Sequence, residues 1–141
     1  MTPRVTEGGE LSRLMVDPRA SIRDALRALD ESAEAIIFIG NIHTREVQGV
    51  VTDGDLRRAL LRGADLDTTS VSSAMQRDFV WVSPDAGRAE ILDLMRARRI
   101  EQLPVLDDRR CLSGLHTLAR MVSARERPNA GILLAGGRGT R

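Results

Sequence analysis

Apolar residues recur along the chain at two spacings, one typical of helices and the other typical of strands. Ser21 is a candidate N-cap, and Asp24 follows three residues later, as in a capping box. Apolar positions at helical spacing mark the buried face of the helix that begins there: Ile22, Ala25, Leu26 and Leu29. The pattern then predicts a strand at 36–39, a turn at 40–41, a strand at 46–52 and a helix that contains Leu56, Ala59 and Leu60.

The same order of elements occurs again about 66 residues further along the chain. Pro18 and Pro84 are 66 residues apart, residues 36–39 correspond to 103–106 at 67, and 49–52 correspond to 114–117 at 65. A helix around 91–95, strands at 103–106 and 111–117, and a last helix with Leu118, Met121 and Val122 complete the second copy; short extra segments occupy 11–16 and 71–82. Neither copy of about 60 residues buries much surface alone, so we expect them to pack together.

Composition narrows the class of protein without identifying it. The chain has 141 residues, 42% hydrophobic and 29% charged, which excludes a wholly disordered protein. It lacks both an apolar run long enough to span a membrane and a signal-peptide core, so we expect a cytoplasmic protein with no membrane partner. With 21 basic and 20 acidic residues and only 2% aromatic residues, the sequence also argues against a nucleic-acid partner.

Three motifs carry a family resemblance. Gly-Val-Val-Thr-Asp-Gly-Asp-Leu at 49–56 resembles the signature of a cystathionine β-synthase (CBS) domain, in which Gly, two apolar residues and Ser/Thr-x-x-Asp close the last strand and open the last helix. Leu-Pro-Val-Leu-Asp at 103–107 resembles the apolar-Pro-Val-apolar-Asp strand of the family, and Val-Ser-Ser-Ala-Met at 71–75 resembles the segment that begins a copy. The resemblance covers about residues 11–125.

The resemblance implies an α+β fold of two CBS motifs, each β-α-β-β-α, packed by pseudo-twofold symmetry as a Bateman module. We therefore expect an N-terminal arm at 1–10, a first CBS motif at 11–66 and a second at 67–125. Residues 126–141 are then a linker followed by the start of another domain.

Thr52, Asp53 and Asp55 lie where a predicted strand gives way to a helix, and this position suits a phosphate group. Unpaired backbone N–H groups and the positive end of the helix dipole favour an anion there. The Thr52 hydroxyl can donate to a phosphate oxygen, and the Asp55 carboxylate can accept from both hydroxyls of a ribose. The alternative is that Thr52 and Asp53 only cap the helix, with Asp55 a first-turn acid stabilised by about 0.3–1 kcal/mol. Arg57 and Arg58 either form a solvated face or approach the phosphates.

The resemblance further implies an adenosine-containing ligand whose base lies against the first strand. The backbone and side chains of Ala33, Ala35 and Ile37 are the candidate contacts, and the two small alanines leave room for a purine. AMP, ADP and ATP are the candidate regulatory ligands, and no cofactor is assigned. His43 and His116 have no cluster of acidic ligands nearby, so no metal site is predicted; His116 is expected to be a core or rim residue with satisfied polar atoms.

The second copy departs from the family pattern at one position. It keeps Gly114 and Thr117 but has Arg120 where the first copy has Asp55. Arginine has no acceptor for ribose hydroxyls, so Arg120 either reaches a phosphate across the cleft or fills the site. The sequence therefore predicts one working nucleotide site. The basic run at 96–99 closes a helix, where positive charge suits the dipole, and no further role is predicted for it.

The last twelve residues contain an apolar stretch followed by Gly-Gly-x-Gly-Thr-Arg. They resemble the opening of sugar-phosphate nucleotidyltransferases, which transfer a nucleotidyl group from an NTP to a sugar 1-phosphate. The resemblance implies that the triphosphate is held by Gly136, Gly137, Gly139, Thr140 and Arg141, and that the catalytic domain uses Mg²⁺. The alternative is a Gly-rich C-terminus without such a role.

Three functional hypotheses follow from these observations. The first is a regulatory CBS pair that binds an adenine nucleotide, forms a homodimer and controls a nucleotidyltransferase. The second is a ligand-free CBS pair that acts as a dimerisation module. The third, that the fragment is itself an enzyme, is disfavoured because residues 1–130 show no nucleophile–base pair, metal cluster or paired catalytic acids; only the longer protein would be an enzyme.

Overall fold

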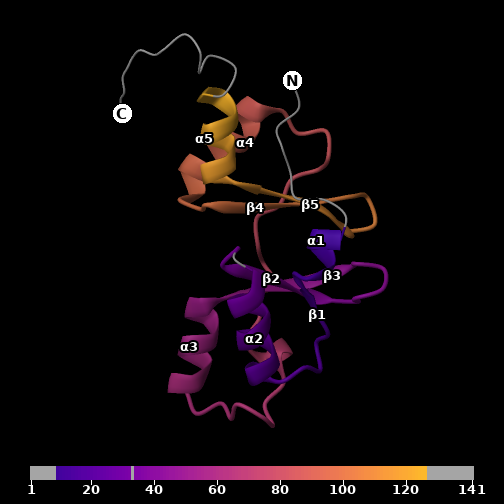
Figure 1. The fold of residues 1–141 in the computed structure, drawn as a ribbon, viewed down its shortest axis with the longest axis vertical. Helices are drawn as coiled ribbons and strands as arrows, with labels where there is room; N and C mark the ends of the chain where they lie inside the picture. Colours follow the sequence, from indigo (N-terminus) through magenta and orange to yellow (C-terminus); the bar gives the residue numbers. More distant parts are fainter. Residues whose placement is uncertain (1–8, 33, 127–141) are drawn as a thin grey trace.

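Two units of the same design lie one above the other in the computed structural model, which describes residues 9–32 and 34–126 (Figure 1). The first unit contains α1 (Gly9–Ser12), β1 (Met15–Val16), α2 (Ile22–Ser32), β2 (Ile36–Gly40), β3 (Val47–Thr52) and α3 (Asp53–Leu61). The second contains the 3-10 turn η1 (Val71–Ser73), α4 (Arg88–Arg98), β4 (Gln102–Leu106), β5 (Leu112–Thr117) and α5 (Leu118–Glu126). The α+β repeat predicted from the sequence is confirmed. No helix within the described part of the chain has the length and hydrophobicity needed to cross a membrane.

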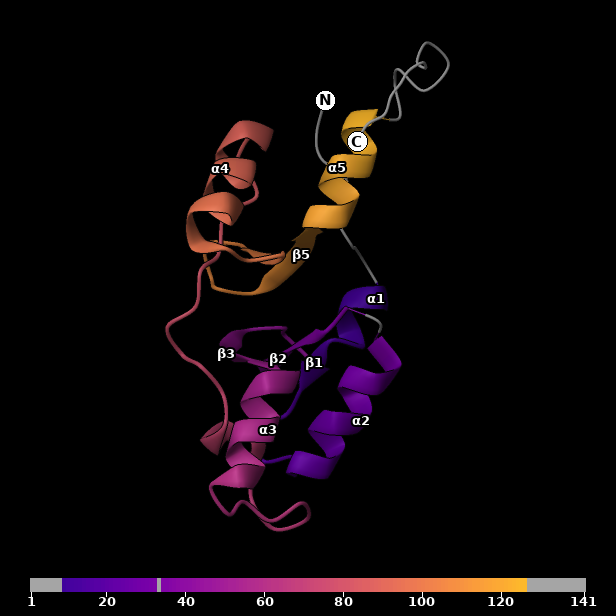
Figure 2. The same ribbon diagram turned by 90° about the vertical axis from the view of Figure 1, so that its left-hand side faces the viewer.

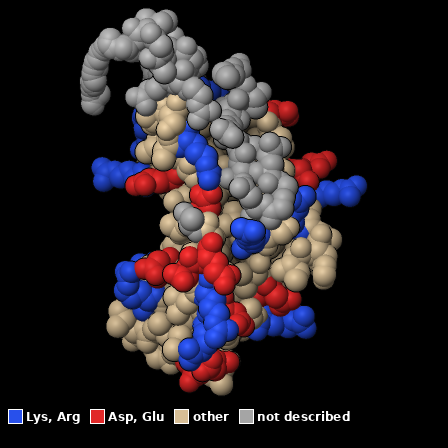
Figure 3. Space-filling model, viewed as in Figure 1, with Lys and Arg blue, Asp and Glu red and all other residues tan. Residues whose placement is uncertain are grey.

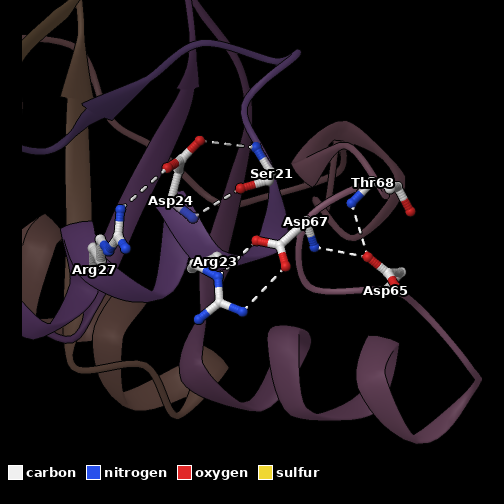
Figure 4. Close-up of polar contacts among 7 residues, drawn as sticks. All are labelled: Ser21, Arg23, Asp24, Arg27, Asp65, Asp67 and Thr68. Carbon is white, nitrogen blue, oxygen red and sulfur yellow. Dashed lines mark hydrogen bonds and ion pairs between the residues drawn. The ribbon is translucent and has the colours of Figure 1, made fainter.

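The reciprocal bonds between Ser21 and Asp24 begin α2, as predicted from the capping-box pattern. The Asp24 N–H donates to Ser21 Oγ at 3.1 Å, and the Ser21 N–H donates to Asp24 Oδ2 at 3.2 Å (Figure 4). Arg27, one turn further along, lies 3.9 Å from the Asp24 carboxylate. Two backbone donors at the start of the helix are thereby satisfied.

The loop that follows α3 is attached to the start of α2. The Arg23 guanidinium donates to both oxygens of Asp67 at 2.6 and 3.1 Å, and the Asp65 carboxylate accepts from the N–H groups of Asp67 and Thr68 (Figure 4). A backbone bond from Ile22 to Thr69, at 3.2 Å, continues this attachment. The loop therefore delivers η1 to the first unit, although η1 begins the second copy of the repeat.

The two sheets differ in size but share one hairpin geometry. In the first sheet, β1 runs parallel to β2, which is antiparallel to β3. In the second, β4 and β5 are antiparallel, and the counterpart of β1 is reduced to a single parallel bridge between Val82 and Val105. Both hairpins have a register shift at the same place, after Ile39 and after Val105.

The tips of the two hairpins pair with each other around the pseudo-twofold axis. The Val47 N–H donates to the Arg110 carbonyl at 2.9 Å, and the Leu112 N–H donates to the Arg45 carbonyl at 2.8 Å. Arg45 and Arg110 adopt nearly the same left-handed backbone, with φ of 68° and 64°. This exchange of equivalent bonds confirms the predicted pseudo-twofold packing.

The core lies between the two sheets, and helices cover their outer faces (Figure 2). Its central cluster takes residues from both units: Leu11, Leu14, Met15, Ile36, Phe38, Val47 and Val50 from the first, and Leu106, Leu112 and Leu115 from the second. The segment that begins each unit also crosses over, because α1 contacts β5 while Val71 and Ala74 belong to the core of the first unit. Each unit therefore depends on the other for burial.

Charges of both signs are interspersed on the surface. Figure 3 shows acidic and basic side chains next to one another over the described part of one face. Pairs such as Arg23 with Asp67 and Arg57 with Asp53 account for part of this pattern. The surface thus agrees with the near-neutral formal charge of +1.

Gly49 permits the close approach of the segment that connects the two units. A Cβ atom at this position would lie 2.8 Å from Met75 Sδ and 2.9 Å from the backbone oxygen of Gln76. The backbone of Gln76 is held there by hydrogen bonds with Val50 in both directions, at 2.8 and 3.0 Å. The clash therefore cannot be relieved by a side-chain rotation alone.

We expect Gly49→Ala to lower the free energy of unfolding by about 1–3 kcal/mol, the usual cost of overpacking. Urea unfolding followed by circular dichroism measures this change. Gly87→Ala is the matched control, because no atom lies within 4 Å of a Cβ at that position; its cost should stay below about 1 kcal/mol. Equal effects of the two substitutions would contradict the role given to Gly49.

His116 is a buried residue of β5 at the position that Val51 holds in β3. It is 5% exposed, and its Nδ1 has no hydrogen-bond partner within the described residues. The sequence prediction was therefore right about burial and wrong about satisfied polar atoms. Burial lowers the pKa of His116 below 6.5, because the charged imidazolium cannot be hydrated there.

The lowered pKa of His116 predicts a loss of stability in acid. Below about pH 6.5 the unfolded chain binds a proton at this residue before the folded protein does, so unfolding is favoured as the pH falls further. We expect His116→Val to reduce the dependence of the unfolding free energy on pH between 7.5 and 5. His43→Gln, at an exposed position in the first hairpin, should keep the wild-type dependence; an unchanged slope in His116→Val would contradict the prediction.

Candidate functional site

A cavity of about 500 Å³ lies between the two units, beside the N-terminus of α3. The first unit contributes Ile36, Val50, Thr52 and Asp55; the connecting segment contributes Gln76, Asp78, Phe79 and Val80; the second unit contributes Arg98, Arg99, Ile100, Glu101, Gln102 and Pro104. The volume is in the range of small-molecule sites, which is about 300–1,000 Å³.

The end of α4 shapes the side of the cavity that belongs to the second unit. Arg99 has a left-handed backbone, with φ of 55°, and closes the helix through its N–H bond to the Arg96 carbonyl at 3.3 Å. The chain then turns into β4, which brings Arg98, Arg99 and Glu101 to the cavity. Guanidinium groups therefore lie in the same cavity as an apolar wall that includes Val50 and Pro104.

Asp55 is the buried acid of the cavity, and four donors surround its carboxylate. Oδ2 accepts from the N–H and the hydroxyl of Thr52, at 2.9 and 3.0 Å. Oδ1 accepts from Arg58 Nη2 and from Gln76 Nε2, each at 2.7 Å. The side chain is 5% exposed. It therefore joins the start of α3 to the connecting segment.

The hydrogen bonds keep this buried acid ionised. Burial alone would raise the pKa of Asp55, because a charged carboxylate loses its hydration. The bonds from Gln76, from the N–H and hydroxyl of Thr52, and from Arg58 outweigh burial and lower the pKa below 3.8. Asp55 is thus an anionic acceptor at neutral pH, which is the form that hydroxyl groups of a ligand would bind.

The geometry bears on the two interpretations of the signature. Thr52 and Asp55 form the N-terminal cap of α3, so the capping interpretation describes this ligand-free structure. The same two residues line the cavity, so capping and ligand binding involve the same atoms. Neither interpretation excludes the other.

Asp53 and Ala35 lie apart from Thr52 and Asp55. Both line a separate cavity of about 470 Å³, together with Leu26, Leu29 and Asp30. Asp53 is exposed and pairs with Arg57, four residues further along α3. Ala35 is also exposed, with φ of 64°. The structure therefore does not bring these two predicted ligand contacts to the larger cavity.

Ile37 requires a correction. Its side chain is fully buried, at 0% exposure, in the core of the first unit. Side chains alternate along β2, so Ile36 faces the sheet interface and the cavity while Ile37 faces the helices. The expectation that the Ile37 side chain lies against a base is wrong for this structure. Ala33 and residues 136–141 lie outside the described residues.

The counterpart of Asp55 in the second unit is engaged with the first unit. Arg120 Nη2 donates to Glu34 Oε2 at 2.5 Å, and the Arg120 N–H donates to Thr117 Oγ1 at 3.2 Å. Thr117 occupies the position that Thr52 has in the first copy. Of the two interpretations of Arg120, the structure agrees with the one in which its side chain fills the site, because its guanidinium is held by a carboxylate of the other unit.

Sequence reasoning missed several residues of the cavity. Gln76 follows directly after the family segment at 71–75, and Phe79 lies three residues later, but nothing in their spacing indicates a site. Arg98 and Arg99 belong to a basic run to which only a role in the helix dipole was assigned. The run closes a helix just before a strand, and this position was the one available signal.

The Glu34–Arg120 pair is expected to couple the two units energetically. A double-mutant cycle with Glu34→Ala and Arg120→Ala isolates this interaction from the other contacts of either residue. Because the two side chains are 14% and 37% exposed, we expect a coupling free energy of about 0.5–1 kcal/mol. Chemical unfolding of the four proteins gives this value, and additive effects of the two substitutions would contradict it.

Two intertwined motifs with a ligand-sized cavity between them define a paired repeat module. The CBS domain family matches residues 1–62 and 71–125, and the chain belongs to this family. The predicted CBS pair is thereby confirmed. The nucleotidyltransferase resemblance rests on residues 130–141 and has no counterpart among the relatives described next.

The relatives share this pair within larger proteins. The chain is 35% identical over 101 residues to the arabinose 5-phosphate isomerase KdsD of Yersinia pestis, a match that covers 72% of this chain and 30% of that protein. It therefore spans less than a third of that relative. A conserved protein from Pyrococcus horikoshii has a similar structure, with a TM-score of 0.71 and 24% identity over 89% of this chain and 93% of that one.

A second structural neighbour contains a ligand. The cytosolic domain of the Mg²⁺ channel MgtE, in complex with ATP, matches with a TM-score of 0.65 and 24% identity, over 80% of this chain and 45% of that one. At these identities the two structures support the shared fold.

Proposed function

We propose that this CBS pair is a regulatory module that binds one adenine nucleotide per chain in the cavity beside α3. The observation that carries the proposal is the ionised, buried carboxylate of Asp55 at the wall of a cavity between the units. A buried anion that is not needed for packing is typical of a site that recognises hydroxyl groups.

The cavity offers a place for each part of a nucleotide. Val50, Phe79 and Pro104 belong to its wall and suit the faces of a purine base. The Asp55 carboxylate suits the two ribose hydroxyls, because it carries only acceptors. Arg98 and Arg99 suit the phosphate groups, since guanidinium forms paired hydrogen bonds with phosphate oxygens.

Regulation would act through the arrangement of the two units. The cavity is lined by both units and by the segment that connects them. A ligand that fits one arrangement better than another shifts the population toward it, and the shift is limited by the difference in affinity. The ATP complex of the related MgtE domain supports a nucleotide as the ligand.

Isothermal titration with AMP, ADP and ATP tests this proposal. We expect saturable binding near one equivalent, and at least a tenfold loss of affinity in Asp55→Ala, because the ribose hydroxyls lose a charged acceptor. Asp53→Ala is the matched control: it removes a carboxylate from the same helical turn but from the other cavity, so affinity should stay within about twofold.

Two outcomes would oppose the proposal in different ways. Binding that Asp53→Ala abolishes and Asp55→Ala preserves would move the ligand to the other cavity. No binding of any nucleotide would favour the ligand-free module that dimerises a larger protein, for which the Glu34–Arg120 pair across the units is the supporting contact. Sedimentation of the chain with and without nucleotide then measures the homodimer that we propose in either case.

We further propose that the pair is cytoplasmic and controls a sugar-phosphate nucleotidyltransferase, with residues 126–141 as linker and first loop. The support is the Gly-Gly-x-Gly-Thr-Arg string after an apolar stretch, together with glycines that let backbone amides approach a phosphate. The isomerase KdsD, whose named substrate is a sugar phosphate, places a related pair in a larger enzyme.

The reading frame that encodes residues 130–141 provides the test of this second proposal. We expect its product to release pyrophosphate from an NTP in the presence of a sugar 1-phosphate and Mg²⁺. The adenine nucleotide that binds the pair should change this rate, and Asp55→Ala should remove that response. Isomerase activity without pyrophosphate release would overturn the assignment.

A further inference from the structure

We propose that Gln76 is an internal competitor for the nucleotide: its side-chain amide occupies a ribose position on Asp55 and must leave when the ligand binds. This inference rests on the proposed nucleotide site and adds a residue that sets the affinity of that site. It also names the segment of the chain that senses whether the site is occupied.

The carboxylate of Asp55 has no vacant acceptor position in this structure. A carboxylate presents about four lone-pair sites, and four donors use them: two from Thr52, one from Arg58 and one from Gln76. A ribose diol brings two further donors. It can bind only where two of the present donors withdraw.

Gln76 and Arg58 are the donors that can withdraw. Both bonds from Thr52 are local and form the cap of α3, so their loss would open the helix. The Gln76 residue and the Arg58 side chain are exposed, the latter at 59%, so both polar groups are hydrated once they are released. They also share Oδ1, which frees one whole oxygen for the ligand.

Gln76 differs from Arg58 because it begins the segment that connects the units. Its backbone pairs with Val50 of the first sheet in both directions. Six residues later, Val82 accepts from the Leu106 N–H at 2.9 Å and donates to the Pro104 carbonyl at 3.0 Å in the second sheet. Between these attachments the segment lines the cavity. Displacement of the Gln76 amide therefore removes one attachment of the segment to the first unit.

The test compares affinities for ribose and dideoxyribose forms of the same nucleotide. Whichever of AMP, ADP and ATP binds wild type most tightly is titrated, together with its 2′,3′-dideoxy form, into wild type and Gln76→Ala. We expect about a five- to tenfold gain of affinity for the ribose form, because the variant has no amide to displace from a charged acceptor. The dideoxy form should gain nothing, since it brings no hydroxyl to Asp55.

Matched variants separate competition from a change of cavity shape. Gln76→Met retains the length of the side chain and lacks the donor, so it should reproduce the gain. Gln48→Ala removes an exposed glutamine of β3 that does not line the cavity and should leave both affinities unchanged. The emission of Trp81, the one tryptophan of the chain, checks that each variant is folded.

The outcomes distinguish this inference from the proposed function. If Asp55→Ala abolishes binding but Gln76→Ala weakens it, or changes both forms of the nucleotide equally, the site stands and the competitor is overturned. If neither wild type nor any Gln76 variant binds a nucleotide, the proposed function fails as well. Binding that appears only in the Gln76 variants would support the competitor directly.

Discussion

The structure depends on the contact between two small sheets, neither of which can bury its inner face alone. The first sheet has three strands and the second has two, and their apolar faces form one cluster that includes Phe38 and Leu115. Because the opening segment of each unit packs on the other, separation would expose both cores at once. Folding and the relative placement of the units are therefore one event, and the cavity between them exists only in the assembled pair.

Asp55 shows how a structural requirement and a binding site share the same atoms. A carboxylate three residues after Thr52 satisfies the backbone donor at the start of α3, and its remaining acceptors face the cavity. In the first unit those acceptors take exposed donors that can be replaced. In the second unit Arg120 reverses the charge and is held by Glu34, so the pseudo-symmetric fold carries an asymmetric pair of sites.

Local patterns were sufficient for the elements and for the repeat. The capping box at Ser21, the alternating strands and the recurrence near 66 residues depend on neighbours in sequence, and each predicted helix and strand is present. The candidate site was predicted in part: Thr52 and Asp55 line the cavity, but Asp53 and Ala35 line another one and the side chain of Ile37 is buried.

The sequence by itself determined the secondary structure, the duplication and the loss of the carboxylate at Arg120, because these follow from residue type and spacing. The tertiary structure alone decided which residues meet across the units. Gln76 reaches Asp55 from 21 residues away, and Glu34 reaches Arg120 from 86 residues away. Such contacts depend on the register of two sheets packed face to face, and no local pattern of side chains encodes that register.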